Sequence, residues 1–172
     1  RFRLRPFTET VILITQEREE LHMKKIVLAS ASPRRRELLS QVGVAFEVKP
    51  ASGEERITSA EPAKVVEELS RQKAMFTAYA LEEEENRDLR DVVVIGADTV
   101  VSYEGKILGK PADETAAIEM LAMLQGNTHQ VYTGVTLLIR EKGRWKAHTF
   151  HECTDVSFYP VTEEEIKEYV NS

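Results

Sequence analysis

The stretch that decides the fold is residues 24–43, with the sequence KKIVLASASPRRRELLSQVG. Residues 26–29 form an apolar run of the length and β-branched content expected of a buried strand. Ser32 and Pro33 then indicate a helix start, because a serine hydroxyl can accept a first-turn N–H and proline suits the first helical position. We therefore expect a strand that passes directly into a helix ending near Gly43.

The first turn of this expected helix carries Arg34, Arg35 and Arg36, although the helix macrodipole disfavours cations there by about 0.3–1 kcal/mol each. Arg34 and Arg35 stand one helical turn before Leu38 and Leu39. We expect both arginines near a buried face and only Arg36 to be freely solvated. Either this is an ordinary surface helix with solvated arginines, or its N-terminus binds an anion.

An anion site at this position would combine several kinds of donor. The helix N–H groups, the hydroxyls of Ser30 and Ser32, and the guanidinium groups of Arg34 and Arg35 suit a polyanion such as the phosphate chain of a nucleotide. The formal net charge of −6 argues against a general nucleic-acid binder, which needs a broad basic surface. The local basic cluster therefore favours a small anionic ligand.

The composition is that of a globular protein, with 172 residues, 42% hydrophobic and 30% charged. The length fits one domain. The single cysteine, Cys153, cannot form an internal disulfide, so we expect a reducing, cytoplasmic setting. No segment approaches the ~20 apolar residues of a membrane span, and the run at 11–14 is too short for a signal-peptide core.

Apolar strands alternate with amphipathic helices along the rest of the chain, which predicts an α/β fold with one domain and a mixed, twisted sheet flanked by helices. Further strands are expected at 45–48, 92–95, 130–139, 145–150 and 154–159, with hairpin connections at 103–106 and around Gly143. Further helices are expected at 62–81, from the cap Asp113 to Gly126, and after a capping box formed by Thr162 and Glu165.

Two places carry carboxylates that are candidates for chemistry. Glu54 and Glu55 lie in a charged loop, where they are either solvated or available to a hard cation carried by a phosphate chain. Asp98 follows an apolar run that Val100 and Val101 continue, so it interrupts a strand more than it starts a turn. Asp98 either makes local hydrogen bonds or acts as a general base or metal ligand.

Three further residues are ambiguous on sequence alone. Lys73 falls on the apolar face of the helix at 62–81, where it either extends to solvent or points into a site. Lys110 precedes Pro111, which keeps it out of helical geometry, and it is either an exposed loop lysine or a phosphate contact. For His129 we expect a structural, hydrogen-bonded role.

The motifs SASPRRRELL, GADT and LGKP, in this order, resemble the Maf family, the septum-formation-related nucleotide pyrophosphatases. The family's acidic pair and its lysine in an LxRxKA-like stretch match at Glu55 and Lys73, although its usual first acid is Asp and here is Glu54. The resemblance covers residues 24–172. It implies an N-terminal extension of unknown role at 1–22, followed by a Maf-like domain at 23–172 that lacks a glycine-rich C-terminal segment of the family.

The resemblance further implies hydrolysis of a nucleoside triphosphate to the monophosphate and pyrophosphate, as a housecleaning or division-linked activity, with Mg²⁺ or Mn²⁺ as cofactor. It implies that Asp98 activates the attacking water and, with Glu55, binds the metal. The combination of Arg34 and Thr99 resembles the subgroup that acts on dTTP and UTP, and a homodimer is also implied. The substrate would be bound by Ser30, Arg34, Arg35, Lys73, Thr99 and Lys110.

Two other classes of function stay open at this level. One is a nucleotide-binding regulatory module, a septum-formation inhibitor with little or no turnover. The other is an RNA-binding domain that uses the arginine turn, which the acidic net charge and the lack of aromatic residues near Arg34 disfavour. We expect neither a stable nucleic-acid partner nor a membrane partner.

Overall fold

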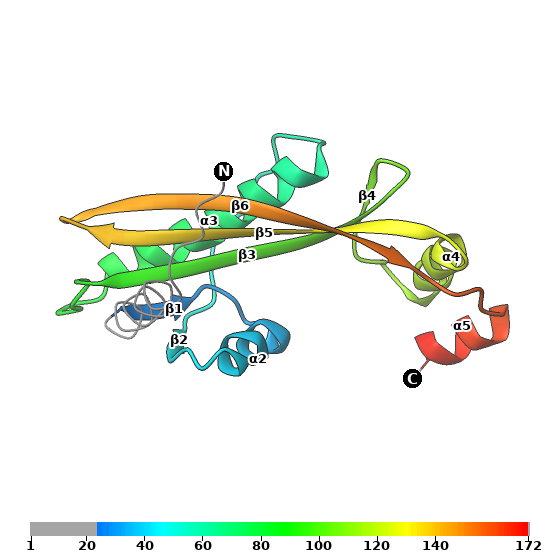
Figure 1. The fold of residues 1–172 in the computed structure, drawn as a ribbon, viewed down its shortest axis with the longest axis horizontal. Helices are drawn as coiled ribbons and strands as arrows, with labels where there is room; N and C mark the ends of the chain where they lie inside the picture. Colours follow the sequence, from blue (N-terminus) through cyan, green and yellow to red (C-terminus); the bar gives the residue numbers. More distant parts are fainter. Residues whose placement is uncertain (1–23, 172) are drawn as a thin grey trace, which may run out of the picture. The chain divides into compact units, whose positions relative to one another are not determined.

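The computed structural model describes residues 24–171 as an α/β fold with a six-stranded mixed sheet and four helices (Figure 1). This confirms the predicted fold class, while the expected extension at 1–22 lies outside the described residues. The strand order is β2-β1-β3-β5-β6, with β4 paired to β3. The elements are β1 (Lys25–Leu28), α2 (Pro33–Gln41), β2 (Phe46–Val48), α3 (Pro62–Glu82), β3 (Val92–Tyr103), β4 (Lys106–Leu108), α4 (Glu114–Leu124), β5 (Thr128–Glu141), β6 (Arg144–Ser157) and α5 (Glu163–Val170).

The chain divides into two compact units, which we describe separately. The described part of unit 1 comprises residues 24–53, 73–96 and 137–148, and that of unit 2 comprises 54–72, 97–136 and 149–171. The elements α3, β3, β5 and β6 contribute residues to both units. None of the helices within residues 24–171 combines the length and apolar character that a bilayer crossing requires.

Unit 1 is organised around β1, which pairs in parallel with β2 on one side and with β3 on the other. The pairing extends beyond β1, because the Ala29 N–H donates to the Ile95 carbonyl at 2.8 Å. Continuous apolar runs suit such a strand, since side chains on both faces are covered. The buried core of this unit consists of Val27, Ala29, Ala74, Ala78, Leu81, Val92, Val94 and Leu138.

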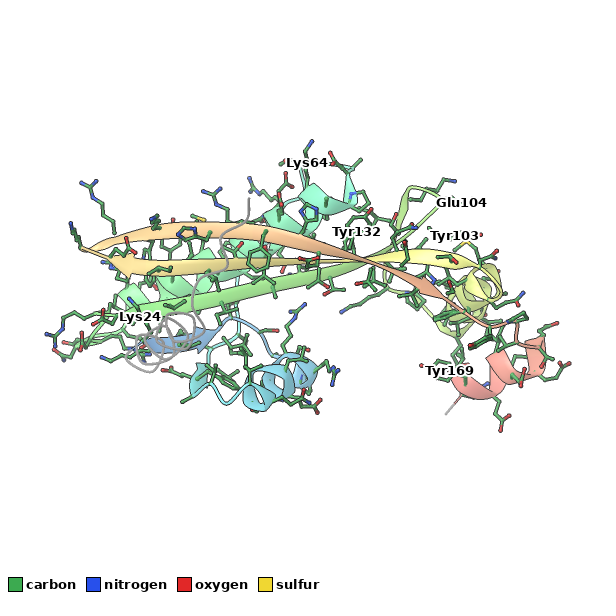
Figure 2. The ribbon with its side chains drawn as sticks, in the orientation of Figure 1. Lys24, Lys64, Tyr103, Glu104, Tyr132 and Tyr169 are labelled. Atoms are coloured by element: carbon green, nitrogen blue, oxygen red, sulfur yellow. The ribbon has the colours of Figure 1, made fainter. Side chains whose placement is uncertain are left out.

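Two hairpins confirm the predicted connections. Glu104 and Gly105, both with positive φ (49° and 76°), join β3 to β4, and Tyr103 and Glu104 mark this turn in Figure 2. Lys142 and Gly143, with φ of 48° and 78°, join β5 to β6. Two central residues of positive φ give the twist that a two-residue hairpin needs.

The expectation of separate strands at 145–150 and 154–159 is wrong, because β6 is continuous over Arg144–Ser157. The polar residues between the two expected strands suggested a break. Almost every residue of β6 is exposed, so the strand needs no regular apolar alternation to continue its pairing with β5.

In unit 2, α3 touches β5 at Gly134, where the two backbones nearly meet. A Cβ atom at Gly134 would lie 2.2 Å from the carbonyl oxygen of Val66. The Thr136 hydroxyl lies 3.0 Å from that of Ser70 on α3 and 2.9 Å from that of Thr149 on β6. The close approach of α3 to β5 therefore requires glycine at position 134, because any other residue would place a Cβ atom against the α3 backbone.

We predict that Gly134→Ala destabilises the protein by about 1–3 kcal/mol or more, since the added methyl group meets backbone and not a flexible side chain. Gly109→Ala is the matched control, because a Cβ there meets nothing within 4 Å. Urea unfolding of both variants measures the difference. Equal unfolding midpoints for the two variants would contradict this account of the α3 contact.

Candidate functional site

The junction between β1 and α2 is organised by the hydroxyl of Ser30. Ser30 is buried, with 7% of its surface exposed. Its Oγ accepts a hydrogen bond from the Ser32 backbone N–H at 3.2 Å and another from Nη1 of Arg35 at 3.0 Å. A hydroxyl that accepts twice still has its own proton to donate. Ser30 thus fixes the Arg35 guanidinium and has a donor for an anion.

The start of α2 is only partly as predicted. Ser32 is the N-cap and Pro33 occupies the first turn, as expected. The Ser32 hydroxyl, however, makes no capping hydrogen bond, so that expectation is wrong. The extended backbone of Ser32 directs its N–H to Ser30, and the first-turn N–H groups gain no acceptor from the Ser32 side chain. Such a helix N-terminus suits an external acceptor.

The arginines of the first turn lie in different environments. Arg35 is half-buried against Ser30, and Arg36 is exposed, as predicted. Arg34 is also exposed, with Nη1 3.5 Å from Oε2 of Glu37. The expectation that Arg34 lies near a buried face is wrong, since α2 has no buried residue and Leu38 is 46% exposed. The reason is that α2 lies beside the short edge strand β2, which offers little apolar area.

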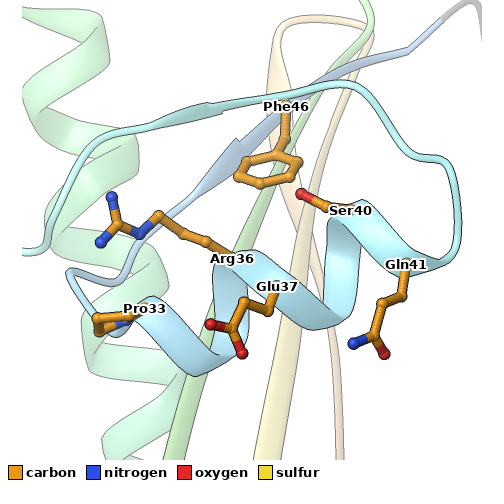
Figure 3. A pocket seen from close by; sticks show the side chains of 6 residues that line it. All are labelled: Pro33, Arg36, Glu37, Ser40, Gln41 and Phe46. Atoms are coloured by element: carbon orange, nitrogen blue, oxygen red, sulfur yellow. The ribbon is translucent and has the colours of Figure 1, made fainter.

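An open pocket of about 590 Å³ lies between α2 and β2 in unit 1. Figure 3 shows Arg36 and Ser40 on the side of α2 that faces Phe46, while Glu37 and Gln41 extend to the other side. Of the arginine cluster, Arg36 lines this pocket, and none of the predicted site residues does. The remaining predicted residue of unit 1, Lys73, is half-buried on α3.

In unit 2, Glu55 is exposed in a loop that α3 holds in place. The side-chain amide of Gln72 pairs with the backbone of Arg56: its Oε1 accepts from the Arg56 N–H at 2.8 Å, and its Nε2 donates to the Arg56 carbonyl at 2.6 Å. Glu68 accepts from the Thr58 N–H at 2.9 Å, and hydrogen bonds from Thr58 hold the pKa of Glu68 below its ordinary value. These contacts restrict the backbone that carries Glu55.

The strand β3 continues through Asp98 to Tyr103, as the apolar residues after Asp98 predicted. Asp98 is half-buried and Thr99 is exposed. The Oγ1 of Thr99 lies 3.1 Å from that of Thr133 on β5, a partner that sequence reasoning missed. Adjacent strands bring the two hydroxyls together across 34 residues of chain, which no local pattern signals.

The last predicted binding residue, Lys110, is exposed in the connection from β4 to α4 in unit 2. This connection ends at Asp113, whose carboxylate accepts from the Ala116 N–H at 2.8 Å and caps α4 as predicted. Its path is therefore fixed just after Lys110 and Pro111. An extended lysine in such a segment presents its ammonium group to solvent or to a ligand.

The expectation of a hydrogen-bonded His129 is wrong for Nδ1. His129 is buried, with 3% exposure, and within the described residues Nδ1 has no hydrogen-bond partner. Its ring instead packs edge-on against Phe158, at 4.7 Å between centroids.

The chemistry of Glu55 and Asp98 fits a hard divalent cation. Residues 24–171 contain no group of three or more His, Cys, Asp or Glu side chains that could hold a metal on their own. Mg²⁺ bound with a nucleotide takes most of its ligands from water and phosphate and needs only one or two protein carboxylates. Glu55 and Asp98 are therefore of the ligand type that such a cation takes from a protein.

Comparisons with known proteins agree with these motifs. The family model described as Maf-like protein matches residues 25–172. The dTTP/UTP pyrophosphatase of Agathobacter rectalis is 56% identical over 156 residues, which are 87% of this chain and 76% of that protein. The dTTP/UTP pyrophosphatase of Bacillus cereus is 46% identical over 163 residues, covering 94% of this chain and 74% of that protein. One from Bacillus thuringiensis subsp. konkukian is 48% identical over 151 residues, covering 87% and 73%.

We predict that Ser30→Ala destabilises the chain by about 1–3 kcal/mol, because two donors lose a buried acceptor. Ser32→Ala is the control and should cost less than the ~0.5–2 kcal/mol typical of an N-cap, since the Ser32 hydroxyl makes no capping bond. Equilibrium unfolding in urea measures both. A larger loss for Ser32→Ala than for Ser30→Ala would reverse our assignment of the two hydroxyls.

Proposed function

This chain belongs to the Maf family, and from that membership we propose that it hydrolyses nucleoside triphosphates to the monophosphate and pyrophosphate, with dTTP and UTP favoured. The relatives that share 46% and 56% of their aligned residues with it are named for this substrate pair. The observation that carries the proposal is the hydrogen bond between buried Ser30 and Arg35 at the start of α2. It directs a guanidinium group to a helix end that already favours anions.

In this proposal, residues of unit 1 bind phosphate. Arg35 is pre-oriented by Ser30, so less side-chain entropy is lost when it binds. Arg34 exchanges its exposed ion pair with Glu37 for a phosphate oxygen, at small cost because exposed pairs contribute about 0–1 kcal/mol. Lys73 adds a cation from α3. Together these residues neutralise a triphosphate, which is most of what phosphoryl transfer demands.

Residues of unit 2 supply the rest of the proposed chemistry. Glu55 and Asp98 would hold a divalent cation, Mg²⁺ or Mn²⁺, which when bound neutralises phosphate charge. Asp98 takes a proton from water, the water oxygen attacks the α-phosphorus, and the bond to the bridging oxygen of the β-phosphate breaks, so that pyrophosphate leaves. Lys110 would stabilise the charge of the departing pyrophosphate.

The preference for dTTP and UTP is supported by Arg34 and Thr99, which resemble the residues of the family subgroup with that preference. We place the activity in the cytoplasm, as a nucleotide housecleaning or division-linked activity, in keeping with a single cysteine. The rival function, a regulatory module that binds nucleotide with little turnover, shares the same phosphate contacts. Turnover therefore separates the two.

We predict that Asp98→Asn lowers kcat by about 10²–10⁴-fold, as expected for loss of a general base, while the Kd for dTTP changes by less than about tenfold. Pyrophosphate release and calorimetry measure the two quantities. Asp91→Asn is the control, because Asp91 is exposed and its φ of 59° is one that asparagine tolerates. A kcat for Asp98→Asn equal to that of Asp91→Asn would remove Asp98 from the mechanism.

We also predict that, in a panel of nucleotides, pyrophosphate is released fastest from dTTP and UTP, and that a chelator abolishes the release until Mg²⁺ or Mn²⁺ is restored. Faster hydrolysis of 7-methyl-GTP, the nucleotide used by another subgroup of the family, would overturn the substrate assignment. Tight dTTP binding with no pyrophosphate from any nucleotide would instead support the regulatory module.

A further inference from the structure

Without a hydrogen-bond partner, the side chain of Thr99 would rotate freely about χ1. Thr99 is exposed on β3, directly after Asp98. A threonine hydroxyl is both donor and acceptor, and it changes direction with χ1. A residue that distinguishes substrates by a hydrogen bond needs that direction fixed. Thr133 supplies a partner, since the two Oγ1 atoms lie 3.1 Å apart.

Thr133 is itself held in place by its neighbours on β5. Thr133 is half-buried and precedes Gly134, where the α3 backbone leaves no room for a side chain. The hydroxyl of Thr136, three residues on, bonds to Ser70 on α3 and to Thr149 on β6. The part of β5 that carries Thr133 is therefore pinned to a helix and a second strand, all within unit 2.

We infer that Thr133 is a positioning residue that sets the pyrimidine preference of the proposed pyrophosphatase by fixing the hydroxyl of Thr99. The inference rests on the proposed function. Of the two protons in the hydroxyl pair, one is shared between Thr99 and Thr133 and the other stays available to a ligand. A hydroxyl with a fixed direction disfavours a ligand that covers it without pairing with it, because a polar group that loses water and gains no partner is costly.

Steady-state kinetics of Thr133→Val test this inference, since valine keeps the strand-forming shape and removes the hydroxyl. We expect the KM for dTTP and UTP to rise about 2- to 12-fold, the factor that one hydrogen bond is worth. We expect kcat to stay within about twofold, because the contact is equal in ground and transition states. The preference for dTTP over GTP, measured as the ratio of their kcat/KM values, should fall by the same factor as the KM for dTTP rises.

Two variants separate positioning from a structural effect. Thr133→Ser retains the hydroxyl and should restore the wild-type KM. Thr128→Val removes a hydroxyl from the same strand, one that lies 2.7 Å from Ser157 Oγ, and should leave KM and preference unchanged. An unchanged KM in Thr133→Val, an equal shift in Thr128→Val, or no rescue by Thr133→Ser would each overturn the inference.

Calorimetric titration with dTTP distinguishes a failure of this inference from a failure of the proposed function. If the wild-type chain turns over dTTP and Thr133→Val behaves identically, only the inference fails. If the wild-type chain binds dTTP without turnover and Thr133→Val binds it several-fold more weakly, the enzyme assignment fails and the role of Thr133 stands. A wild-type chain that neither binds nor hydrolyses dTTP would overturn both.

Discussion

The positive end of α2 carries Arg34, Arg35 and Arg36, a concentration of charge that opposes the helix macrodipole. The structure accommodates it by holding one guanidinium group on the buried Ser30 hydroxyl at 3.0 Å. Ser30 can do this because β1 ends just before it, in parallel pairing with β3, and the Ala29 N–H continues that pairing to Ile95. The core of unit 1 thus fixes the position of the arginine that the proposed function needs.

Local features of the fold could be predicted from sequence because they depend on neighbouring residues. Pro33 fixed the start of α2, and Thr162 with Glu165 forms the expected capping box of α5. Features that depend on distant surroundings could not. The Ser32 hydroxyl makes no cap although its sequence position suits one, and Leu38 is exposed although its spacing is that of a buried face. Periodicity identifies an apolar stripe, but the area available to cover it is a tertiary property.

The candidate site follows the same division. The places of two candidate residues in the fold, Asp98 within a strand and Lys110 in the connection before a helix, could be predicted from motif and pattern, while their roles stay proposals. The residues that support them could not. Gln72 reaches the Arg56 backbone across 16 residues, and Thr133 reaches Thr99 across 34. These pairs form because α3 packs against the loop at Arg56 and because β5 lies next to β3 in the sheet. Neither arrangement can be predicted from a single sequence.

These supporting contacts give the proposed chemistry its physical basis. Phosphoryl transfer depends on groups that are oriented before the substrate arrives, because reorganisation during the reaction adds to the barrier. Ser30 orients Arg35, and Gln72 restrains the loop of Glu55. The strand β3 carries Asp98 within regular structure and not in a loop. The orientation of Arg35 and of the loop that carries Glu55 is thus fixed by neighbouring side chains before any substrate binds.

The most direct measurement of the central claim is a crystal structure of the chain with a dUTP analogue whose α and β phosphorus atoms are joined by a non-hydrolysable imido group. The account predicts phosphate oxygens within hydrogen-bond distance of the guanidinium groups of Arg34 and Arg35 and of the first-turn N–H groups of α2. Phosphates bound elsewhere, with both guanidinium groups directed into solvent, would contradict it.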